Sequence, residues 1–432
     1  MSAAVCSRSW QEDVAGRLIR IARQRPDRPA VIDVHGTTTF GTLYTAAARH
    51  AREAERRTAV DGGVAALHAA STAAFVAQVC GELLAGRTPL VLAPRIAQET
   101  VDQALREVRH ARLAGCHAWK AVLAVLDGRQ VPVVTHGESP GAPRKALALG
   151  MMRGGRSLIA APLYLNGPLE FALRQLLLGG SVLLLPRFTP DRWAKAVHDE
   201  RPDWAFLVPT QLQHLWDTIG DTTASEVCAP LQRLVHSSAP CPTGLGERLA
   251  AGLGSKLCEY YGTTLYDGTI TRPGQLAGQP LPGAQLRIVD RCHRPVPPGT
   301  TGQVEGRSSS GLLSHPASMV CHGQPIWQGV GDIGRLLPGG RVEIAGVDVA
   351  GRVIVAGVKV APEDTRQVLL AHPAVTACTV AAVSHPRFGS VLTATIQTRR
   401  CDLTPAELRS WCAQRLTAPQ RPHALEVHPC LP

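Results

Sequence analysis

Aromatic residues are scarce in this sequence: phenylalanine, tryptophan and tyrosine together make up only 4% of its 432 residues. Proteins that bind single-stranded nucleic acids use aromatic side chains as stacking platforms, so this scarcity argues against such a surface. Basic residues are plentiful, but only five of the 45 are lysine, and they are scattered rather than gathered into runs. The sequence therefore predicts no nucleic-acid partner.

Long apolar runs and clustered cysteines are also missing. The longest apolar stretches, such as Ser181–Pro186, have the length of a strand and fall far short of a membrane span. The twelve cysteines form no C-x-x-C pair, and the group His110, Cys116 and His117 lacks a second ligand pair, which disfavours zinc. The first residues include acidic side chains and no apolar core segment, so no secretory signal is expected. These absences predict a cytoplasmic protein with free thiols and no membrane span.

The sequence does hold a large apolar fraction and an excess of positive charge. Hydrophobic residues make up 45% of the chain, which suits a soluble protein with a substantial core. The net charge of +11 favours an anionic ligand, such as a nucleotide or a phosphopantetheine arm. A chain of this length has room for two or three domains.

Short apolar runs alternate with helical patterns along the first 230 residues. Pro29–Asp33 and Val64–His68 read as buried strands separated by helical spacing, which predicts a mostly parallel sheet covered by helices. From Leu281 onward, short strands separated by Pro- and Gly-rich turns predict a small barrel-like β subdomain. We therefore predict an α/β fold. It has a large N-terminal domain of helix-covered sheets plus that β subdomain (residues 1–346), followed by a small mobile α+β C-terminal domain (residues 347–432).

The segment from Thr135 to Lys145, THGESPGAPRK, fits two kinds of site. Residues 137–141 match G-x-S-x-G, the nucleophile elbow of serine hydrolases. In that elbow the residue after the serine donates its backbone N–H to the oxyanion hole, but here it is Pro140, which has no N–H. The alternative is a glycine-rich loop that surrounds phosphate groups with backbone N–H donors. The missing donor favours the phosphate loop.

Motifs on both sides of the middle of the chain follow one another in a consistent order. They are Pro162–Gly167 (PLYLNG), Leu178–Pro186, Phe206–Thr210, Ser237–Pro240 (SSAP), Glu259–Thr264 (EYYGTT), Gly278–Gly283, Gly331–Gly334 (GDIG) and Pro362–Val375. In combination they resemble the acyl-adenylate-forming superfamily of AMP-binding enzymes, which contains acyl-CoA synthetases, peptide-synthetase adenylation domains and luciferases. The resemblance covers nearly the whole chain. It implies an enzyme that activates a carboxylic acid with ATP as an acyl adenylate and then passes the acyl group to a thiol.

The resemblance also implies roles for individual residues. Tyr261 would stack on adenine, and Asp332 would accept hydrogen bonds from the ribose hydroxyls. Taken alone, Tyr261 fits a core aromatic equally well, and Asp332 fits a carboxylate that caps a turn. Leu165 and Asn166 would line the acyl pocket, whose apolar character suggests a fatty or aromatic acid. The expected nucleotide-binding residues are Thr135, Gly137, Ser139, Gly141, Arg144, Ser238, Ala239, Tyr261, Gly262, Thr263, Thr264 and Asp332.

Some residues depart from the family's motifs where its chemistry takes place. Glu138 adds a negative charge to the phosphate loop, which would repel a triphosphate. Arg144 replaces the loop lysine, and Lys145 is a candidate partial substitute. Leu265 stands where the family has a glutamate that helps to hold magnesium, so Asp267 is the candidate replacement for a metal site that has no confirmed ligand.

The sequence ends at Pro432, just before the family's G-K motif, so the C-terminal domain is expected to stop short of the usual catalytic lysine. No catalytic residue is assigned for this reason. Two hypotheses remain. The first is an AMP-forming acid–thiol ligase with degraded motifs that uses ATP, Mg²⁺ and either CoA or the phosphopantetheine of an acyl carrier protein. The second is a catalytically inactive or half-reaction relative that binds an acyl adenylate or a carrier protein.

Overall fold

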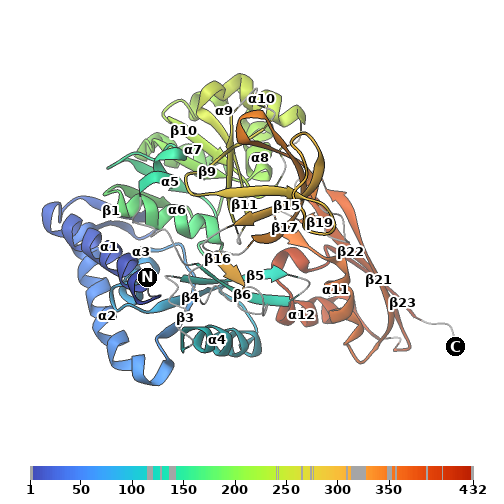
Figure 1. Ribbon diagram of the computed structural model, residues 1–432. Coiled ribbons are helices and arrows are strands. Elements are labelled where there is room, and N and C mark those ends of the chain that lie inside the picture. The colour runs from blue at the N-terminus through green and yellow to red at the C-terminus, as the bar shows by residue number, and fades with distance from the viewer. Residues whose placement is uncertain are drawn as a thin grey trace.

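The protein has a large N-terminal part built on three sheets and a smaller unit of helices and strands at its C-terminal end, as the computed structural model shows (Figure 1). The structure describes residues 3–113, 120–126, 129–135, 143–239, 241, 243–263, 266–272, 275, 277–307, 310–312, 327–347, 353–355, 358–385, 388–400 and 402–429. Within these ranges, no helix is both long enough and apolar enough to cross a lipid bilayer.

The largest sheet has nine strands in the order β13-β12-β11-β10-β9-β7-β8-β1-β2, and its neighbours from β11 to β1 run parallel. Side chains alternate along an extended strand, so each strand contributes to two cores. In β9, Trp204 and Phe206 pack on one face, whereas Ala205 and Leu207 pack on the other. The strands are β1 (Pro29–Asp33), β2 (Gly36–Thr39), β7 (Arg156–Ile159), β8 (Ser181–Leu184), β9 (Trp204–Leu207), β10 (Arg233–His236), β11 (Leu257–Thr263), β12 (Tyr266–Thr271) and β13 (Gln279–Pro280).

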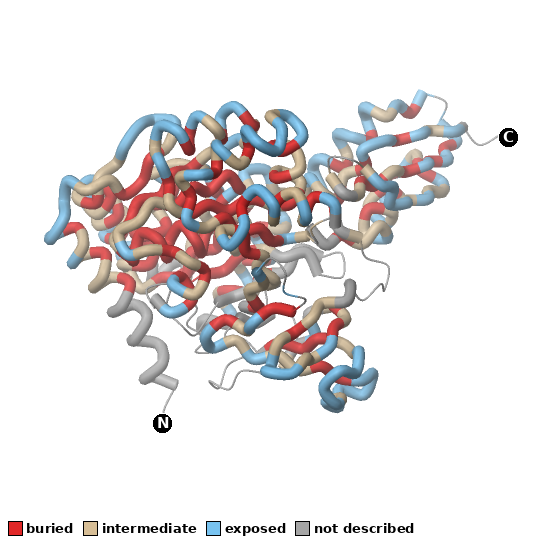
Figure 2. The backbone as a smooth tube through the Cα atoms, turned by 90° about the horizontal axis from the view of Figure 1, so that it is seen from above, coloured by how far each residue is buried: buried red, intermediate tan, exposed pale blue. Residues whose placement is uncertain are grey.

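Helices cover both faces of this sheet, and the buried backbone concentrates between them (Figure 2). Threonine side chains start three of the helices: Thr39, Thr72 and Thr189 each accept a hydrogen bond from a first-turn backbone N–H. On the Trp204 face lie α1 (Ala3–Gln24), α2 (Phe40–Asp61), α3 (Ala73–Leu84), α5 (Pro143–Ala148) and α6 (Asn166–Leu177). On the other face lie α7 (Pro190–Glu200), α8 (Pro209–Ile219), α9 (Asp221–Val227) and α10 (Thr243–Leu253), and the short 3₁₀ helix η1 (Gly254–Lys256) follows.

A second sheet has five strands in the order β16-β6-β5-β4-β3. Strands β3, β4 and β5 are parallel, β5 and β6 form an antiparallel hairpin, and β16 adds to β6. Val101, Ala104 and Val108 of one helix pack this sheet's core. The elements are β3 (Val64–His68), β4 (Thr88–Leu92), α4 (Gln98–Leu113), β5 (Lys120–Leu126), β6 (Arg129–Thr135) and β16 (Ser310–Leu312).

A third, antiparallel sheet in the order β14-β15-β17-β18 corresponds to the predicted β subdomain. Its small core contains Ile288, Val304 and Val342. The elements are β14 (Gln285–Val289), β15 (Thr301–Arg307), β17 (Trp327–Leu337), the 3₁₀ helix η3 (Pro338–Gly340) and β18 (Arg341–Val347).

The C-terminal unit packs two helices on a three-stranded sheet of order β21-β22-β23, with a separate hairpin of β19 and β20. Leu369, Ile396 and Leu408 are fully buried in its core. The elements are β19 (Val353–Val355), β20 (Val358–Val360), α11 (Pro362–Leu370), β21 (Val375–His385), β22 (Gly389–Thr398), α12 (Pro405–Arg415), η4 (Ala418–Gln420) and β23 (Ala424–Pro429).

The predicted fold class is confirmed: helix-covered sheets, a curled antiparallel sheet and a small α+β unit follow one another along the chain. The structure differs from the prediction in one respect, because the early strands do not share one sheet. Strand β1 belongs to the nine-stranded sheet, whereas β3 and β4 belong to the five-stranded sheet. The boundary between residues 346 and 347 stays a prediction.

Candidate functional site

The carboxyl ends of β9, β10 and β11 lie side by side, because these strands are parallel neighbours. Ligands of open α/β sheets bind outside this edge. Two of the predicted nucleotide-binding residues, Ser238 and Ala239, follow directly after β10, and Tyr261 and Gly262 lie near the end of β11. Ser238 has a φ of 79°, a left-handed conformation that costs a serine about 1–3 kcal/mol and is common at ligand sites.

A hydrogen bond joins Tyr261 to Asp332 across two sheets. The Tyr261 hydroxyl donates to Oδ2 of Asp332 over 2.6 Å, although the residues are 71 positions apart. Asp332 is buried, with 3% of its surface exposed, and lies in β17 directly after Gly331, whose φ of 70° suits glycine. The structure therefore brings together the predicted adenine-stacking residue and the predicted ribose-binding carboxylate.

The two basic residues after the predicted phosphate loop differ in their surroundings. Both lie on α5, where Arg144 is exposed and Lys145 is 6% exposed. The positive charge of Lys145 lowers the pKa of Glu170 on α6, a helix that α5 contacts. Arg144 is thus the residue of the pair whose side chain is accessible to a ligand.

The predicted acyl-pocket residues lie at the start of α6. Leu165 is the N-cap residue and offers no side-chain cap, and Asn166 is the first helical residue. The side-chain oxygen of Asn166 is buried and has no hydrogen-bond partner in the described part of the chain. A buried acceptor without a partner costs about 1–3 kcal/mol, so this atom is suited to a ligand that donates a hydrogen bond.

Other predicted residues cannot be placed in full. Gly137, Ser139, Gly141 and Thr264 lie outside the described residues, as do Glu138 and Leu265. Thr135, Thr263 and Asp267 are described as strand residues of β6, β11 and β12, without their side chains. Among the described residues, no group of three or more His, Cys, Asp or Glu side chains is arranged to hold a metal ion.

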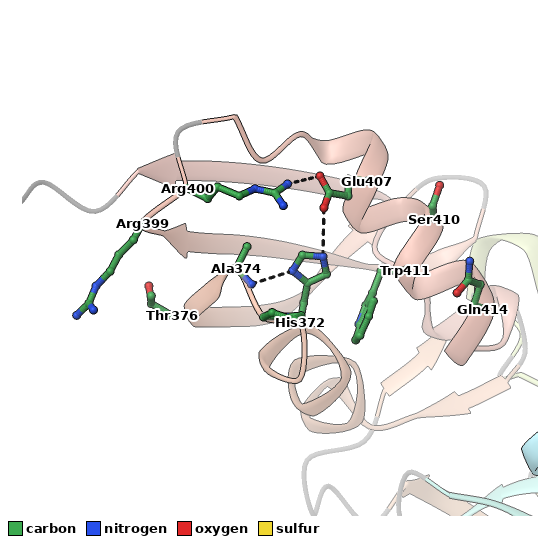
Figure 3. A pocket seen from close by; sticks show the side chains of 10 residues that line it. His372, Ala374, Thr376, Arg399, Arg400, Glu407, Ser410, Trp411 and Gln414 are labelled. Atoms are coloured by element: carbon green, nitrogen blue, oxygen red, sulfur yellow. Dashed lines mark hydrogen bonds and ion pairs between the residues drawn. The ribbon is translucent and has the colours of Figure 1, made fainter.

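A cavity of about 870 Å³ lies elsewhere, in the C-terminal unit (Figure 3). In it, His372 accepts a hydrogen bond from the Ala374 backbone and faces Glu407, which also pairs with Arg400. The lining residues are His372, Pro373, Ala374, Thr376, Arg399, Arg400, Glu407, Ser410, Trp411 and Gln414. None of the predicted nucleotide-binding or acyl-pocket residues belongs to it.

Two family models match the chain, one after the other along the sequence. One, described as AMP-binding enzyme, matches residues 133–312, and the other, described as AMP-binding enzyme C-terminal domain, matches residues 366–432. The chain belongs to the acyl-adenylate-forming superfamily. The resemblance identified from the motifs is confirmed.

Individual members of the superfamily are similar over part of their length. Feruloyl-CoA synthase of Amycolatopsis sp is 28% identical over 292 residues, which are 64% of this chain and 58% of that protein. The fatty acid–[acyl-carrier-protein] ligase ScoC of Streptomyces coeruleorubidus is 26% identical over 262 residues, 55% of this chain and 48% of that protein. The chain thus spans about half the length of these curated relatives.

A solved structure has the same fold over nearly the whole chain. It is a double mutant of o-succinylbenzoate CoA synthetase (MenE) from Bacillus subtilis, bound with a product analogue. The TM-score is 0.79 at 20% sequence identity, and the match covers 96% of this chain and 95% of that one. At this identity the likeness shows the fold alone.

Sequence reasoning did not identify two titratable residues that are register partners on β10 and β11, His236 and Glu259. His236 ends β10, is 3% exposed, and its Nδ1 has no hydrogen-bond partner within the described ranges; burial lowers its pKa to about 4. Its register partner Glu259 in β11 has a pKa raised by burial. The available signal was an ionisable residue in each of two otherwise apolar strand segments, residues 234–236 and 257–259.

The neutral state of His236 predicts a pH-dependent stability. Its pKa is about 4 in the folded protein and 6.5 in its ordinary state, so the unfolded chain binds the proton first. The contribution is fully present above about pH 6.5 and is lost as the pH falls towards 4. Urea unfolding of the wild type and of His236→Leu at about pH 7 and about pH 4.5 tests this. Between these two pH values, we expect the unfolding free energy of the wild type to fall by about 2–3 kcal/mol more than that of the variant.

The exposed His198 supplies the control, because its side chain is 86% accessible. His198→Leu should show the same pH dependence as the wild type. If the unfolding free energies of the wild type and His236→Leu changed equally with pH, His236 would not be held neutral in the folded protein.

Proposed function

We propose that this chain is an AMP-forming acid–thiol ligase. It binds ATP at the edge formed by β10, β11 and β17, activates a carboxylic acid as its acyl adenylate, and passes the acyl group to CoA or to the phosphopantetheine of an acyl carrier protein. The observation that carries the proposal is the 2.6 Å hydrogen bond between Tyr261 and Asp332, because it unites two residues from separate motifs at one ligand edge. Family membership supplies the reaction class.

Asp332 would hold the ribose. A carboxylate has about four lone-pair positions, so it can accept the hydrogen bond from Tyr261 and further ones from ribose hydroxyls. The Tyr261 hydroxyl fixes the orientation of the carboxylate, and its ring would lie against adenine. Ser238 and Ala239 would cover the other face of the base.

The reaction needs positioning and charge stabilisation more than proton chemistry. A carboxylate oxygen of the acid attacks the α-phosphorus, and the bond from this phosphorus to the bridging oxygen breaks, so that pyrophosphate leaves with the electron pair. A thiolate sulfur then attacks the acyl carbonyl, and AMP leaves. Arg144 is the exposed cation proposed to meet the phosphates. Mg²⁺, when bound, would neutralise phosphate charge, with Asp267 as the proposed ligand.

The acyl substrate is proposed to be a fatty or aromatic acid. Leu165 is the apolar residue directly before α6, and the neighbouring side chains are apolar as well. Asn166 adds one buried acceptor oxygen to this surface. The proposed pocket would therefore bind an apolar body with few hydrogen-bonding groups.

A second candidate is a catalytically inactive or half-reaction relative that binds an acyl adenylate. It is favoured by Leu265, which cannot coordinate the magnesium ion that a glutamate in this motif would help to hold. Such a protein would bind AMP or an adenylate analogue without activating an acid.

Pyrophosphate exchange into ATP, measured with a panel of fatty and aromatic acids, separates the two candidates when it is combined with thermal-shift titrations. Acid-dependent exchange establishes the ligase. A thermal shift with an acyl-adenylate analogue, without exchange, establishes the binding module. If neither exchange nor any nucleotide-induced thermal shift were observed, the proposed nucleotide site would be refuted.

Tyr261→Phe tests the observation that carries the proposal. The variant keeps the ring but removes the hydroxyl that orients Asp332, so we expect the affinity for AMP to fall about tenfold, in line with the loss of one hydrogen bond to a charged group. Isothermal titration calorimetry measures this change. Tyr44→Phe on α2, outside the proposed site, should bind AMP like the wild type, and an equal affinity for Tyr261→Phe would contradict the assignment.

A further inference from the structure

A buried ionic cluster connects β5, α5 and α6. Glu170 and Arg174 lie one turn apart on α6, Lys120 begins β5, and Lys145 lies on α5. We call these four residues the Glu170 cluster. None of them is more than 8% exposed. Glu170 Oε2 accepts a hydrogen bond from Lys120 Nζ over 3.1 Å, and Oε1 accepts from Nη2 and Nε of Arg174 over 2.6 Å and 3.0 Å.

Glu170 is ionised in these surroundings. Burial by itself would raise the pKa of Glu170, but the positive charges of Lys120, Arg174 and Lys145 together hold it well below the usual range. One carboxylate is therefore hydrogen-bonded to cations of β5 and α6 and is also stabilised by the charge of Lys145 on α5. Strand β5 and helix α5 therefore each carry a cation that interacts with the same carboxylate of α6.

In the sequence, the predicted phosphate loop lies between β6, which pairs with β5, and α5. Lys120 is the register partner of Thr135, which ends β6 and begins the predicted loop segment. Lys145 directly follows Arg144, the exposed basic residue after the loop. Glu170 thus interacts with a residue on each side of the loop, by a hydrogen bond with Lys120 and through the charge of Lys145.

Stability alone does not require such a cluster. Replacing a buried ion network by apolar side chains of similar volume is often neutral or stabilising, because desolvation of the charges is costly. What an ionic cluster provides is a defined geometry, since each hydrogen bond works only over a narrow range of distance and angle. An apolar replacement can fill the same space without fixing the same separation.

We infer that Glu170 is a positioning residue for nucleotide binding: it holds β5 and α5 at a fixed separation, so that Arg144 is presented to the β- and γ-phosphates of ATP. This inference rests on the proposed function. It concerns the phosphates that ATP has and AMP lacks. The ratio of the affinities for ATP and AMP is therefore the quantity that Glu170 should control.

Two variants test the inference while keeping Arg144 and Lys145. Lys120→Met removes one arm of the cluster, and the triple variant Lys120→Met, Glu170→Leu, Arg174→Met replaces its charged core by apolar side chains. Isothermal titration calorimetry with ATP and with AMP gives the ratio. We expect the triple variant to lose ATP affinity at least tenfold and AMP affinity less than twofold, with Lys120→Met intermediate. Glu200→Gln breaks the half-buried pair with Arg156, away from this cluster, and should leave the ratio unchanged.

A folded triple variant with the wild-type ratio would overturn the inference, because the cluster would then serve the core only. Lys120→Met with a wild-type ratio would do the same if the triple variant failed to fold. Hydrogen–deuterium exchange over residues 120–126 and 143–149 provides a readout that does not need a nucleotide. If the wild type bound neither ATP nor AMP, the proposed function would fail. Unchanged exchange in the variants would then separately refute the positioning of β5 and α5.

Discussion

Asp332→Ala is expected to lower the affinity for AMP at least about 100-fold and so to abolish the thermal shift that AMP produces in the wild type. The carboxylate is proposed to accept two hydrogen bonds from the ribose, and each hydrogen bond to a charged group contributes about 1.5–3 kcal/mol. Asp332 is buried, and its carboxylate already accepts a hydrogen bond from the Tyr261 hydroxyl. Calorimetric titration with AMP measures the loss.

The same substitution removes the partner of the Tyr261 hydroxyl, so its effect on folding must be measured as well. We expect a loss of about 1–3 kcal/mol in unfolding free energy, which leaves a folded protein at room temperature. Asp332→Asn keeps an acceptor oxygen and should bind AMP with intermediate affinity. Asp199→Ala, at an exposed site on α7, should bind AMP normally. Wild-type AMP affinity in a folded Asp332→Ala would refute the location of the nucleotide site.

Arg87→Met is expected to destabilise the fold by about 3–5 kcal/mol, because it leaves Glu82 buried without its cation. Arg87 and Glu82 are 1% and 4% exposed, and Nε of Arg87 lies 2.5 Å from Oε2 of Glu82. Arg87 also donates from Nη1 to the backbone oxygen of Ala54 over 2.8 Å, so it joins α2 to the end of α3. Urea unfolding followed by circular dichroism measures the loss.

An exposed ion pair gives the matched control. In the pair of Lys195 with Asp199, 78% of the lysine side chain is accessible. Lys195→Met should change the unfolding free energy far less than Arg87→Met does, since exposed pairs are weak. Adding Glu82→Gln to Arg87→Met should restore part of the loss. Equal effects of Arg87→Met and Lys195→Met would show that burial does not strengthen the first pair.

The fold class could be predicted from sequence because the strands are short, apolar and separated by helical spacing. The pattern correctly placed strands at Pro29–Asp33 and Val64–His68, but it could not assign them to different sheets. Periodicity reports which face of a segment is buried, whereas pairing depends on contacts between distant residues. Strand β1 pairs with β8, far along the chain, and no local signal encodes that choice.

In the candidate site, too, motifs identify some residues from the sequence, whereas others become apparent only from contacts in the structure. Asp332 and Tyr261 could be identified because each belongs to a motif, and their hydrogen bond agrees with a shared location. Glu170 and His236 belong to no motif. Glu170 is notable for its buried ionic partners, and His236 for a buried ring nitrogen without a partner among the described residues. Glu170 meets Lys120 across 50 positions, a relation that composition and spacing do not contain. Their roles, and those of the motif residues, stay predictions to be tested.

The pairing of β1 with β8 also sets an order of assembly during synthesis. Ser181 Oγ bonds to the backbone oxygen of Pro29 across 152 positions, so β1 leaves the ribosome long before its partner exists. At about 5–20 residues per second, the delay is roughly 8–30 seconds. Strands β3 to β6 are complete by residue 135 and pair among themselves. The nascent chain is therefore expected to form the β3–β6 sheet first and to close the nine-stranded sheet around it later.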